Sequence, residues 1–102
     1  MYRARDQVDN EEWLARIDRA ADTLDLGSQS RSYATDLFLS HVPDLDRSKP
    51  AVAAASLYAG ALIAGEERSQ TSVAETMDVT RLSVQSRWKD ILRDAGFEPP
   101  TW

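Results

Sequence analysis

The segment that most constrains the fold of this 102-residue chain is residues 51–64, which read AVAAASLYAGALIA. Apolar or small residues fall on every side of a helix drawn through it, a pattern typical of a helix buried on all faces. The segment is shorter than the roughly 20 apolar residues that a membrane-spanning helix needs. We therefore expect a central buried helix over residues 49–64, with the rest of one small domain packed around it.

Three residues define this helix further. Pro50 stands in its first turn, where the missing N–H group of proline costs nothing, and Gly65 is placed to end it. Gly60 lies in its interior, where glycine costs up to about 1 kcal/mol of helix propensity relative to alanine. Its presence predicts that another helix crosses close to this point.

Four more helices are expected from apolar residues that recur at helical spacing. Their expected ranges are residues 10–24, 29–42, 70–77 and 80–95. The tail over residues 96–102 contains two prolines and is not expected to be helical. No strand-like alternation continues for more than a few residues, so the sequence predicts one all-α domain over residues 1–102.

Short polar side chains stand where four of these helices begin. Serine, threonine and aspartate at such positions accept hydrogen bonds from the free backbone N–H groups of the first turn. In chain order the expected N-caps are Asp9, paired with Glu12 in a D-x-x-E pattern, then Ser28 or Ser30, Ser69 and Thr80.

The charge of the chain is negative overall but unevenly distributed. The formal net charge is −5, and residues 1–48 carry ten acidic against six basic residues. Residues 79–93 instead hold four basic residues against Asp90 alone, a net charge of +3. The chain also has eleven aspartates but only two lysines, which is typical of halophilic proteins from salt-loaded cytoplasm. Because phosphate binding weakens steeply with salt, overall acidity argues only weakly against a nucleic-acid partner in such a cell.

The last two expected helices are joined by only Asp78 and Val79. So tight a turn forces the second helix to cross the first steeply, as in a helix-turn-helix. Ala74 is small enough to lie where the two helices touch, and Val79 and Val84 fill the joint. Asp78 tolerates a left-handed backbone better than most residues. The alternative is an unspecialised helical hairpin.

The apolar stripe of residues 80–95 indicates which residues face outward. Val84, Trp88, Ile91 and Ala95 form the expected buried side. Leu82 lies about 200° around the helix from Val84 and should be exposed. An exposed leucine flanked by arginine and glutamine suits a helix that reads the major groove. Two other interpretations stay open, because single exposed leucines are common and because this one could anchor a protein partner.

The candidate DNA-binding residues all lie at this outward side. Those expected to face bases are Arg81, Leu82 and Gln85, since arginine pairs with guanine, glutamine with adenine and leucine with the thymine methyl group. Candidates for phosphate or base contacts are Thr80, Ser83, Ser86, Arg87 and Lys89.

Several segments resemble a known family. They are KPAVAAASLY at 49–58, GEERSQ at 65–70, VAE at 73–75, VT at 79–80 and SVQSRWK at 83–89. They are similar to the second cyclin-like repeat of archaeal transcription factor B and eukaryotic transcription initiation factor IIB. That repeat has a Lys-Pro start, an alanine-rich third helix, a G-E-x-R-T-Q junction and a fifth helix of the type V-T-x-x-x-I-R-x-R-Y-K. The resemblance implies a five-helix cyclin-like box whose fourth and fifth helices form a helix-turn-helix.

The resemblance also implies a function. In that family the fourth and fifth helices of this repeat read DNA beside the TATA box, through one apolar and one arginine side chain. By position these correspond to Leu82 and Gln85, so this chain departs from the arginine that recognises guanine. The zinc ribbon of the family needs Cys or His ligands, and this chain has no cysteine. With no linker and no first repeat either, we expect a lone cyclin box acting as a regulator, not a complete basal factor.

Other function classes find little support in the sequence. The only histidine, His41, lies near a helix C-terminus, where a hydrogen bond to a carbonyl is its common role. No phosphate-binding loop, Ser-His-Asp arrangement or metal-ligand spacing occurs, so we expect neither an enzyme nor a cofactor or metal site. No signal peptide or membrane span is apparent, which favours a cytoplasmic protein.

Promoter DNA is the expected partner. The alternative is an adaptor that contacts the TATA-binding protein, RNA polymerase or another regulator without reading DNA, because the acidic first half suits a basic protein surface. A homodimer is a further expectation, since a missing sister repeat could leave apolar surface uncovered.

Overall fold

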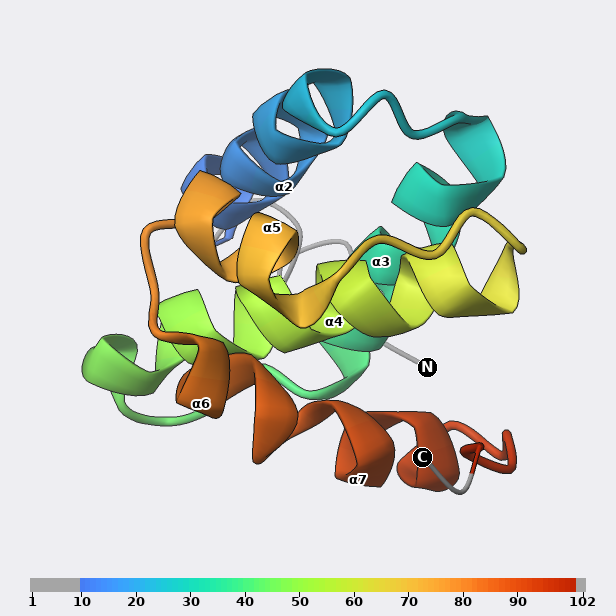
Figure 1. Cartoon of the computed structure of the whole chain (residues 1–102). Coiled ribbons are helices and arrows are strands. Elements are labelled where there is room, and N and C mark those ends of the chain that lie inside the picture. The colour runs from blue at the N-terminus through green and yellow to red at the C-terminus, as the bar shows by residue number, and fades with distance from the viewer. Residues whose placement is uncertain (1–9, 101–102) are drawn as a thin grey trace.

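The computed structural model describes residues 10–100 and is entirely helical in its regular structure over that range (Figure 1). The expected cap Asp9 and the end of the tail at Trp102 lie outside the described residues. The helices are α2 (Glu11–Thr23), α3 (Ser28–Ser40), the short 3-10 helix η1 (Asp46–Ser48), α4 (Lys49–Ile63), α5 (Gln70–Thr76), α6 (Arg81–Gln85) and α7 (Trp88–Asp94).

Helix α4 runs through the middle of the molecule, with α5 on one side of it and α7 on the other (Figure 1). It contacts every other helix of the described chain, and all ten residues from Val52 to Ala61 are buried. The prediction of a central buried helix is therefore confirmed. No helix within residues 10–100 combines the length and the apolar character needed to cross a bilayer.

Helices α3 and α4 approach each other closely at Gly60. A Cβ atom placed there would lie 2.7 Å from the backbone N of Ala34 and 3.0 Å from the carbonyl O of Ser30. Because the obstructing atoms belong to backbone, no side-chain rotation can make room. The crossing predicted from this glycine is thus present, and α3 is the helix that crosses.

Two of the expected helix caps are confirmed and one is wrong. The hydroxyls of Ser69 and Thr80 accept hydrogen bonds from the N–H groups of Ser72 and Ser83, as N-caps do. Helix α3, however, begins after Gly27 and has no side-chain cap of its own. Neither Ser28 nor Ser30 is the N-cap. Instead, the carboxylate of Glu66, from the segment after α4, accepts a hydrogen bond from the N–H of Gly27.

The helix expected over residues 80–95 is two helices. It breaks between α6 and α7, where the N–H of Arg87 bonds to the carbonyl of Val84, three residues back instead of four. A tighter turn of this kind changes the rotation of the next helix relative to the first. As a result Ala95, which an uninterrupted apolar stripe predicts to be buried, is exposed. Leu92, which is not in that stripe, is buried instead.

Candidate nucleic-acid interface

The turn between α5 and α6 has the geometry expected from its sequence. Asp78 adopts a left-handed backbone with φ of +58°, a conformation that aspartate accepts more readily than most residues. This turn lets the N–H of Val79 bond to the carbonyl of Ala74 at 2.9 Å. Ala74 and Val84 are buried at the joint. The two helices therefore form the tight helix-turn-helix arrangement that the pattern predicts.

Helix α6 presents three of the predicted side chains to solvent. Leu82 is 70% exposed, the largest exposed fraction among the large apolar side chains in the described chain. Arg81 and Gln85 are also exposed. None of the three makes a hydrogen bond or ion pair with another residue of the range 10–100, so a cation, an amide and an apolar group are available together on one short helix.

The three hydroxyl residues among the candidates mainly hold the helix together. Thr80 Oγ1 accepts from the N–H of Ser83 at 3.1 Å and lies 2.8 Å from Ser83 Oγ. Ser86 Oγ donates to the carbonyl of Ser83 at 3.3 Å. The bonds of Thr80 fix the start of α6, and the bond of Ser86 lies at its end. Each hydroxyl can still form one further hydrogen bond, as donor or as acceptor.

The remaining two candidates lie elsewhere on the segment. Lys89 is half-buried, with its Nζ 5.6 Å from the centroid of the Trp88 ring, a cation–π contact. Arg87 lines a hollow together with Pro43 and Asp90, on the side of α7 that faces the loop before α4. The structure thus brings Arg81, Leu82 and Gln85 together and places Arg87 and Lys89 apart from them.

Trp88 fixes α7 on the central helix. It is 1% exposed, and its ring meets that of Tyr58 edge to face, with centroids 5.1 Å apart and an angle of 69°. Burial raises the pKa of the Tyr58 hydroxyl, and the neighbouring side chain of Gln70 partly opposes this rise. Helix α7, which follows α6 directly, is therefore anchored to α4 by an aromatic pair in the core.

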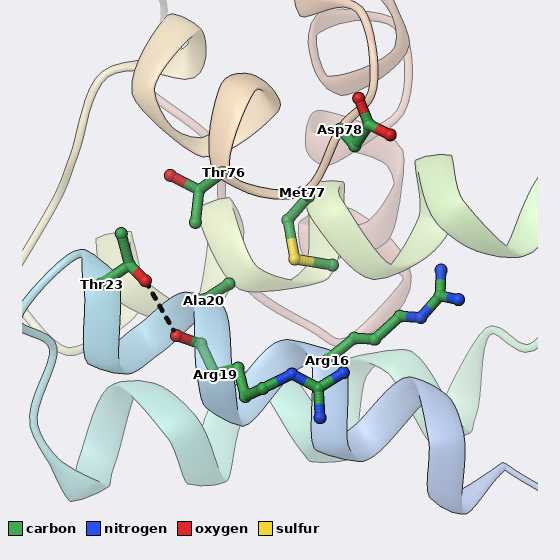
Figure 2. Close-up of a pocket in the computed structure, with 7 residues that line it drawn as sticks. All are labelled: Arg16, Arg19, Ala20, Thr23, Thr76, Met77 and Asp78. Atoms are coloured by element: carbon green, nitrogen blue, oxygen red, sulfur yellow. Dashed lines mark hydrogen bonds between the residues drawn. The ribbon is translucent and has the colours of Figure 1, made fainter.

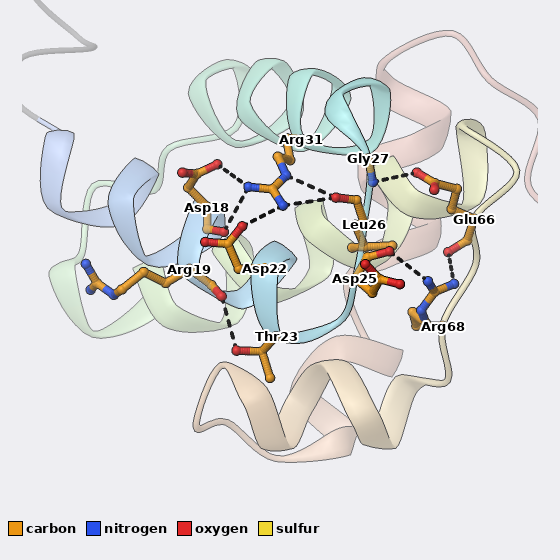
Figure 3. A network of polar contacts seen from close by, with 10 residues as sticks. All are labelled: Asp18, Arg19, Asp22, Thr23, Asp25, Leu26, Gly27, Arg31, Glu66 and Arg68. Atoms are coloured by element: carbon orange, nitrogen blue, oxygen red, sulfur yellow. Dashed lines mark hydrogen bonds and ion pairs between the residues drawn. The ribbon is translucent and has the colours of Figure 1, made fainter.

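The segment after α4, GEERSQ, joins three helices and does not form part of the outward face. Glu66 Oε1 accepts from the N–H of Gly27 at 3.0 Å, a bond drawn in Figure 3. It also accepts from the hydroxyl of Ser30 at 2.7 Å. The hydrogen bond from Ser30 lowers the pKa of the Glu66 carboxyl most, and the bond from Gly27 lowers it further. A carboxylate at this place satisfies the backbone N–H of Gly27 just before α3 and suits the positive end of the helix dipole.

Arg68 binds the carbonyl groups at the C-terminal end of α2. Its guanidinium donates to the carbonyls of Asp25 at 3.1 Å and Glu66 at 2.8 Å (Figure 3). It also donates to the carbonyls of Leu24 at 2.9 Å and Glu67 at 3.2 Å. Carbonyls at a helix C-terminus have no partner within the helix, and a cation there is favoured by the dipole. Sequence reasoning used this motif only as a sign of resemblance and missed its structural role.

Arg31 completes the polar junction (Figure 3). It donates to the carbonyl of Leu26 and forms ion pairs of 3.0 Å with Asp18 and 2.7 Å with Asp22. The hydrogen bonds that its guanidinium donates to Asp22 and Asp18 raise the pKa of Arg31. Arg31 and Arg68 are thus occupied inside the molecule, unlike Arg81.

A hollow of about 220 Å³ lies beside the α5–α6 turn and contains two cations that sequence reasoning did not select (Figure 2). Arg16 and Arg19 of α2 line it opposite Met77 and Asp78. Arg16 is paired with Glu12 at 2.9 Å, whereas the guanidinium of Arg19 forms no ion pair within residues 10–100. The net negative charge of the first half concealed them, and their spacing of three residues, which puts both on one helix face, is the signal that could have found them.

The model of the family "Transcription factor TFIIB repeat" matches residues 12–94. The chain belongs to this family. Its all-helical architecture is accordingly that of a cyclin-like domain, as the resemblance predicted, with the fifth helix of the box divided into α6 and α7.

The TFIIB-repeat chain is similar to archaeal proteins. It is 29% identical over 87 residues to transcription initiation factor IIB 2 of Thermococcus kodakarensis, covering 82% of this chain and 28% of that protein. It is 38% identical over 52 residues to transcription initiation factor IIB of Archaeoglobus fulgidus, covering 51% and 16%. It is 40% identical over 47 residues to that of Methanopyrus kandleri, covering 46% and 15%. The chain therefore spans less than a third of each of these relatives.

Proposed function

We propose that this TFIIB-repeat chain is a regulator of transcription that binds promoter DNA through the helix-turn-helix of α5 and α6. One observation carries the proposal: the side chains of Arg81, Leu82 and Gln85 stand exposed on α6 without partners among residues 10–100. The guanidinium groups of Arg31 and Arg68 are instead held by carbonyls and carboxylates of the fold. The similarity to archaeal transcription initiation factors supports a role in transcription.

The chemistry of these three side chains suits the major groove. An arginine can bond to guanine O6 and N7, a glutamine to adenine N6 and N7, and an apolar side chain can contact the thymine methyl group. The exposed hydroxyl of Thr80 and the side chain of Arg87 would add phosphate contacts, which position the protein without specifying sequence. Lys89 contributes less, because its ammonium already lies over the Trp88 ring.

The test is fluorescence anisotropy with labelled archaeal promoter duplexes over a potassium chloride series. We expect binding that weakens with salt, with a slope that reports the number of phosphates contacted. Arg81→Ala should weaken binding by about tenfold to a hundredfold at the preferred sequence, as loss of a base contact of about 1–3 kcal/mol implies. Leu82→Ala should reduce discrimination between thymine and uracil at one position, since uracil lacks the methyl group.

Arg93→Ala is the matched control. It removes the same charge from the same basic segment, but Arg93 lies in the last turn of α7 and is paired with Asp90 at 3.2 Å. It should leave the affinity nearly unchanged. The proposal fails if no duplex binds at low salt, or if Arg81→Ala and Lys89→Ala bind as tightly as the unchanged chain.

Arg19 tests how far a bound duplex extends beyond α6. It lies in the hollow beside the α5–α6 turn, so a duplex that extends across this turn would place a phosphate near it. Arg19→Ala should then lower the salt slope by about one, as one lost phosphate contact does. An unchanged slope would confine the DNA to α6 and the segment after it.

The second candidate is an adaptor that contacts the TATA-binding protein, polymerase or another regulator. The excess of acidic residues in the first half of the chain favours it, because such a surface repels DNA and suits a basic protein. Affinity capture from native extract at high salt, with Arg81→Ala beside the unchanged chain, separates the two. An adaptor retains its partners in the variant and binds no DNA.

A further inference from the structure

Asp78 places an exposed carboxylate in the turn between α5 and α6, the two helices of the proposed DNA-binding unit. Its side chain forms no hydrogen bond or ion pair with another residue of the range 10–100. Arg16 and Arg19 line the same hollow, but Figure 2 shows the carboxylate of Asp78 directed away from both guanidinium groups. The negative charge at the turn is therefore not neutralised by an ion pair within the described part of the chain.

The backbone of this turn does not require an aspartate. Within the described residues, positive φ occurs at Asp25, Gly65, Asp78 and Gly96. Glycine adopts this conformation at the least cost, and it stands at two of these four positions. The turn at position 78 could thus form without a charged side chain.

The position of Asp78 brings its charge close to the proposed DNA contacts. It precedes Thr80 by two residues and Arg81 by three. Because a chain covers at most about 3.6 Å per residue, the Cα atom of Asp78 lies within about 7 Å of that of Thr80 and about 11 Å of that of Arg81. The Debye length is about 10 Å at an ionic strength of about 0.1 M. A DNA phosphate held at Thr80 would therefore be repelled by Asp78.

The cations beside the turn do not cancel this repulsion. Arg16 is paired with Glu12 at 2.9 Å, which leaves Arg19 as the unpaired cation of the hollow among the residues described. Glu75 of α5 is an exposed carboxylate as well. A phosphate near the turn would be attracted by Arg19 and repelled by Asp78 at the same time.

We propose that Asp78 restrains DNA binding and makes it less sensitive to salt. Repulsion between like charges is strongest at low ionic strength, which is also where the attraction of cations for phosphates is strongest. The carboxylate thus lowers the affinity most where binding would otherwise be tightest. The effect is the same for every duplex, because phosphate contacts carry no direct sequence information. The inference rests on the proposed DNA-binding function and concerns the salt dependence of that same site.

The test repeats the anisotropy titration with labelled promoter duplexes over a potassium chloride series, using Asp78→Asn. Asparagine tolerates a left-handed backbone and removes only the charge. Binding should tighten about twofold to fivefold at about 0.1 M salt, where charges at this separation are only partly screened. The gain should shrink as salt rises, so that the plot of log affinity against log salt becomes steeper by at most about one. Asp78→Gly should behave alike.

Asp25→Asn is the matched control. Asp25 is an exposed aspartate with nearly the same backbone conformation, φ +57°. It lies between α2 and α3, where its carbonyl accepts from Arg68 at 3.1 Å. The variant changes the net charge by the same amount and should leave both the affinity and the salt slope nearly unchanged. Urea unfolding establishes that the three variants are folded.

The outcomes separate this inference from the function on which it rests. If the unchanged chain binds DNA and Asp78→Asn gains no more than Asp25→Asn, the role of Asp78 is wrong and the DNA-binding function stands. A gain that does not change with salt also overturns the inference, because it would not come from charge. If neither the unchanged chain nor any variant binds a duplex at low salt, the DNA-binding function is itself wrong.

Discussion

Two regions of this domain use arginine in opposite ways. At the junction of α2, α3 and the segment after α4, Arg31 and Arg68 are surrounded by carbonyls and carboxylates that use most of their N–H donors. On α6, Arg81 stands exposed with no partner among residues 10–100. The same side chain holds the fold together in one place and is available to a ligand in the other. Sequence similarity covers both, so a motif shared with a relative does not by itself mark a binding residue.

The largest expected effect comes from the first region. Arg68→Ala should lower the free energy of unfolding by about 2–3 kcal/mol, because it leaves four carbonyl groups at a helix end and its flanking loop without their donor. Urea unfolding followed by circular dichroism measures it. Arg93→Ala, which removes an exposed pair, should change the same quantity by less than about 0.5 kcal/mol. If the two variants unfold alike, the contrast between the regions is wrong.

A smaller, pH-dependent effect is expected at Glu66. Its pKa is lowered in the folded protein from the usual 4.5, chiefly by the hydrogen bond from Ser30. The stability that it contributes is therefore fully present above about pH 4.5 and is lost as the pH falls through the lowered value in the folded state. Glu66→Gln should unfold at a lower temperature at pH 7, and its melting temperature should fall less between pH 5 and pH 3 than that of the unchanged chain. Parallel curves would show that this carboxylate plays no part in acid unfolding.

The two helix caps offer a sharper comparison, since they are chemically alike. Ser69→Ala and Thr80→Ala each remove one side-chain acceptor at a helix start and should each cost about 1 kcal/mol of stability. Only Thr80→Ala should also weaken DNA binding, because this cap lies at the exposed start of α6. Equal DNA affinity of the two variants would place the duplex elsewhere.

The smallest effect on stability is expected at α6 itself. Arg81→Ala and Gln85→Ala should each change the free energy of unfolding by less than about 0.5 kcal/mol, since neither side chain bonds to another described residue. Any larger loss would mean that these groups support the fold, and the same urea experiment would detect it.

Much of this architecture could be predicted from the sequence, and the parts that could not have physical causes. The apolar run of α4 and the glycine at its centre are local signals, and they predicted both the buried helix and its close neighbour. The contacts of Glu66 and Arg68 join residues 36 to 44 positions apart, which no local pattern reveals. The break before Trp88 interrupts no apolar position of the pattern, so periodicity alone predicted one helix where there are two. At the site, exposure of Leu82 followed from the helical wheel, but the occupation of the hydroxyls and of Lys89 by neighbours did not.

The short length of α6 limits how much information the proposed interface can carry. Five residues at 1.5 Å each rise about 7.5 Å, a little over two base-pair steps of 3.4 Å. A reader of that length distinguishes two or three adjacent base pairs, a site that recurs roughly once in 16 to 64 base pairs of random sequence. Selectivity along a chromosome would then have to come from a second anchor acting together with α6, which makes the geometry of any neighbouring partner as decisive as the bases themselves.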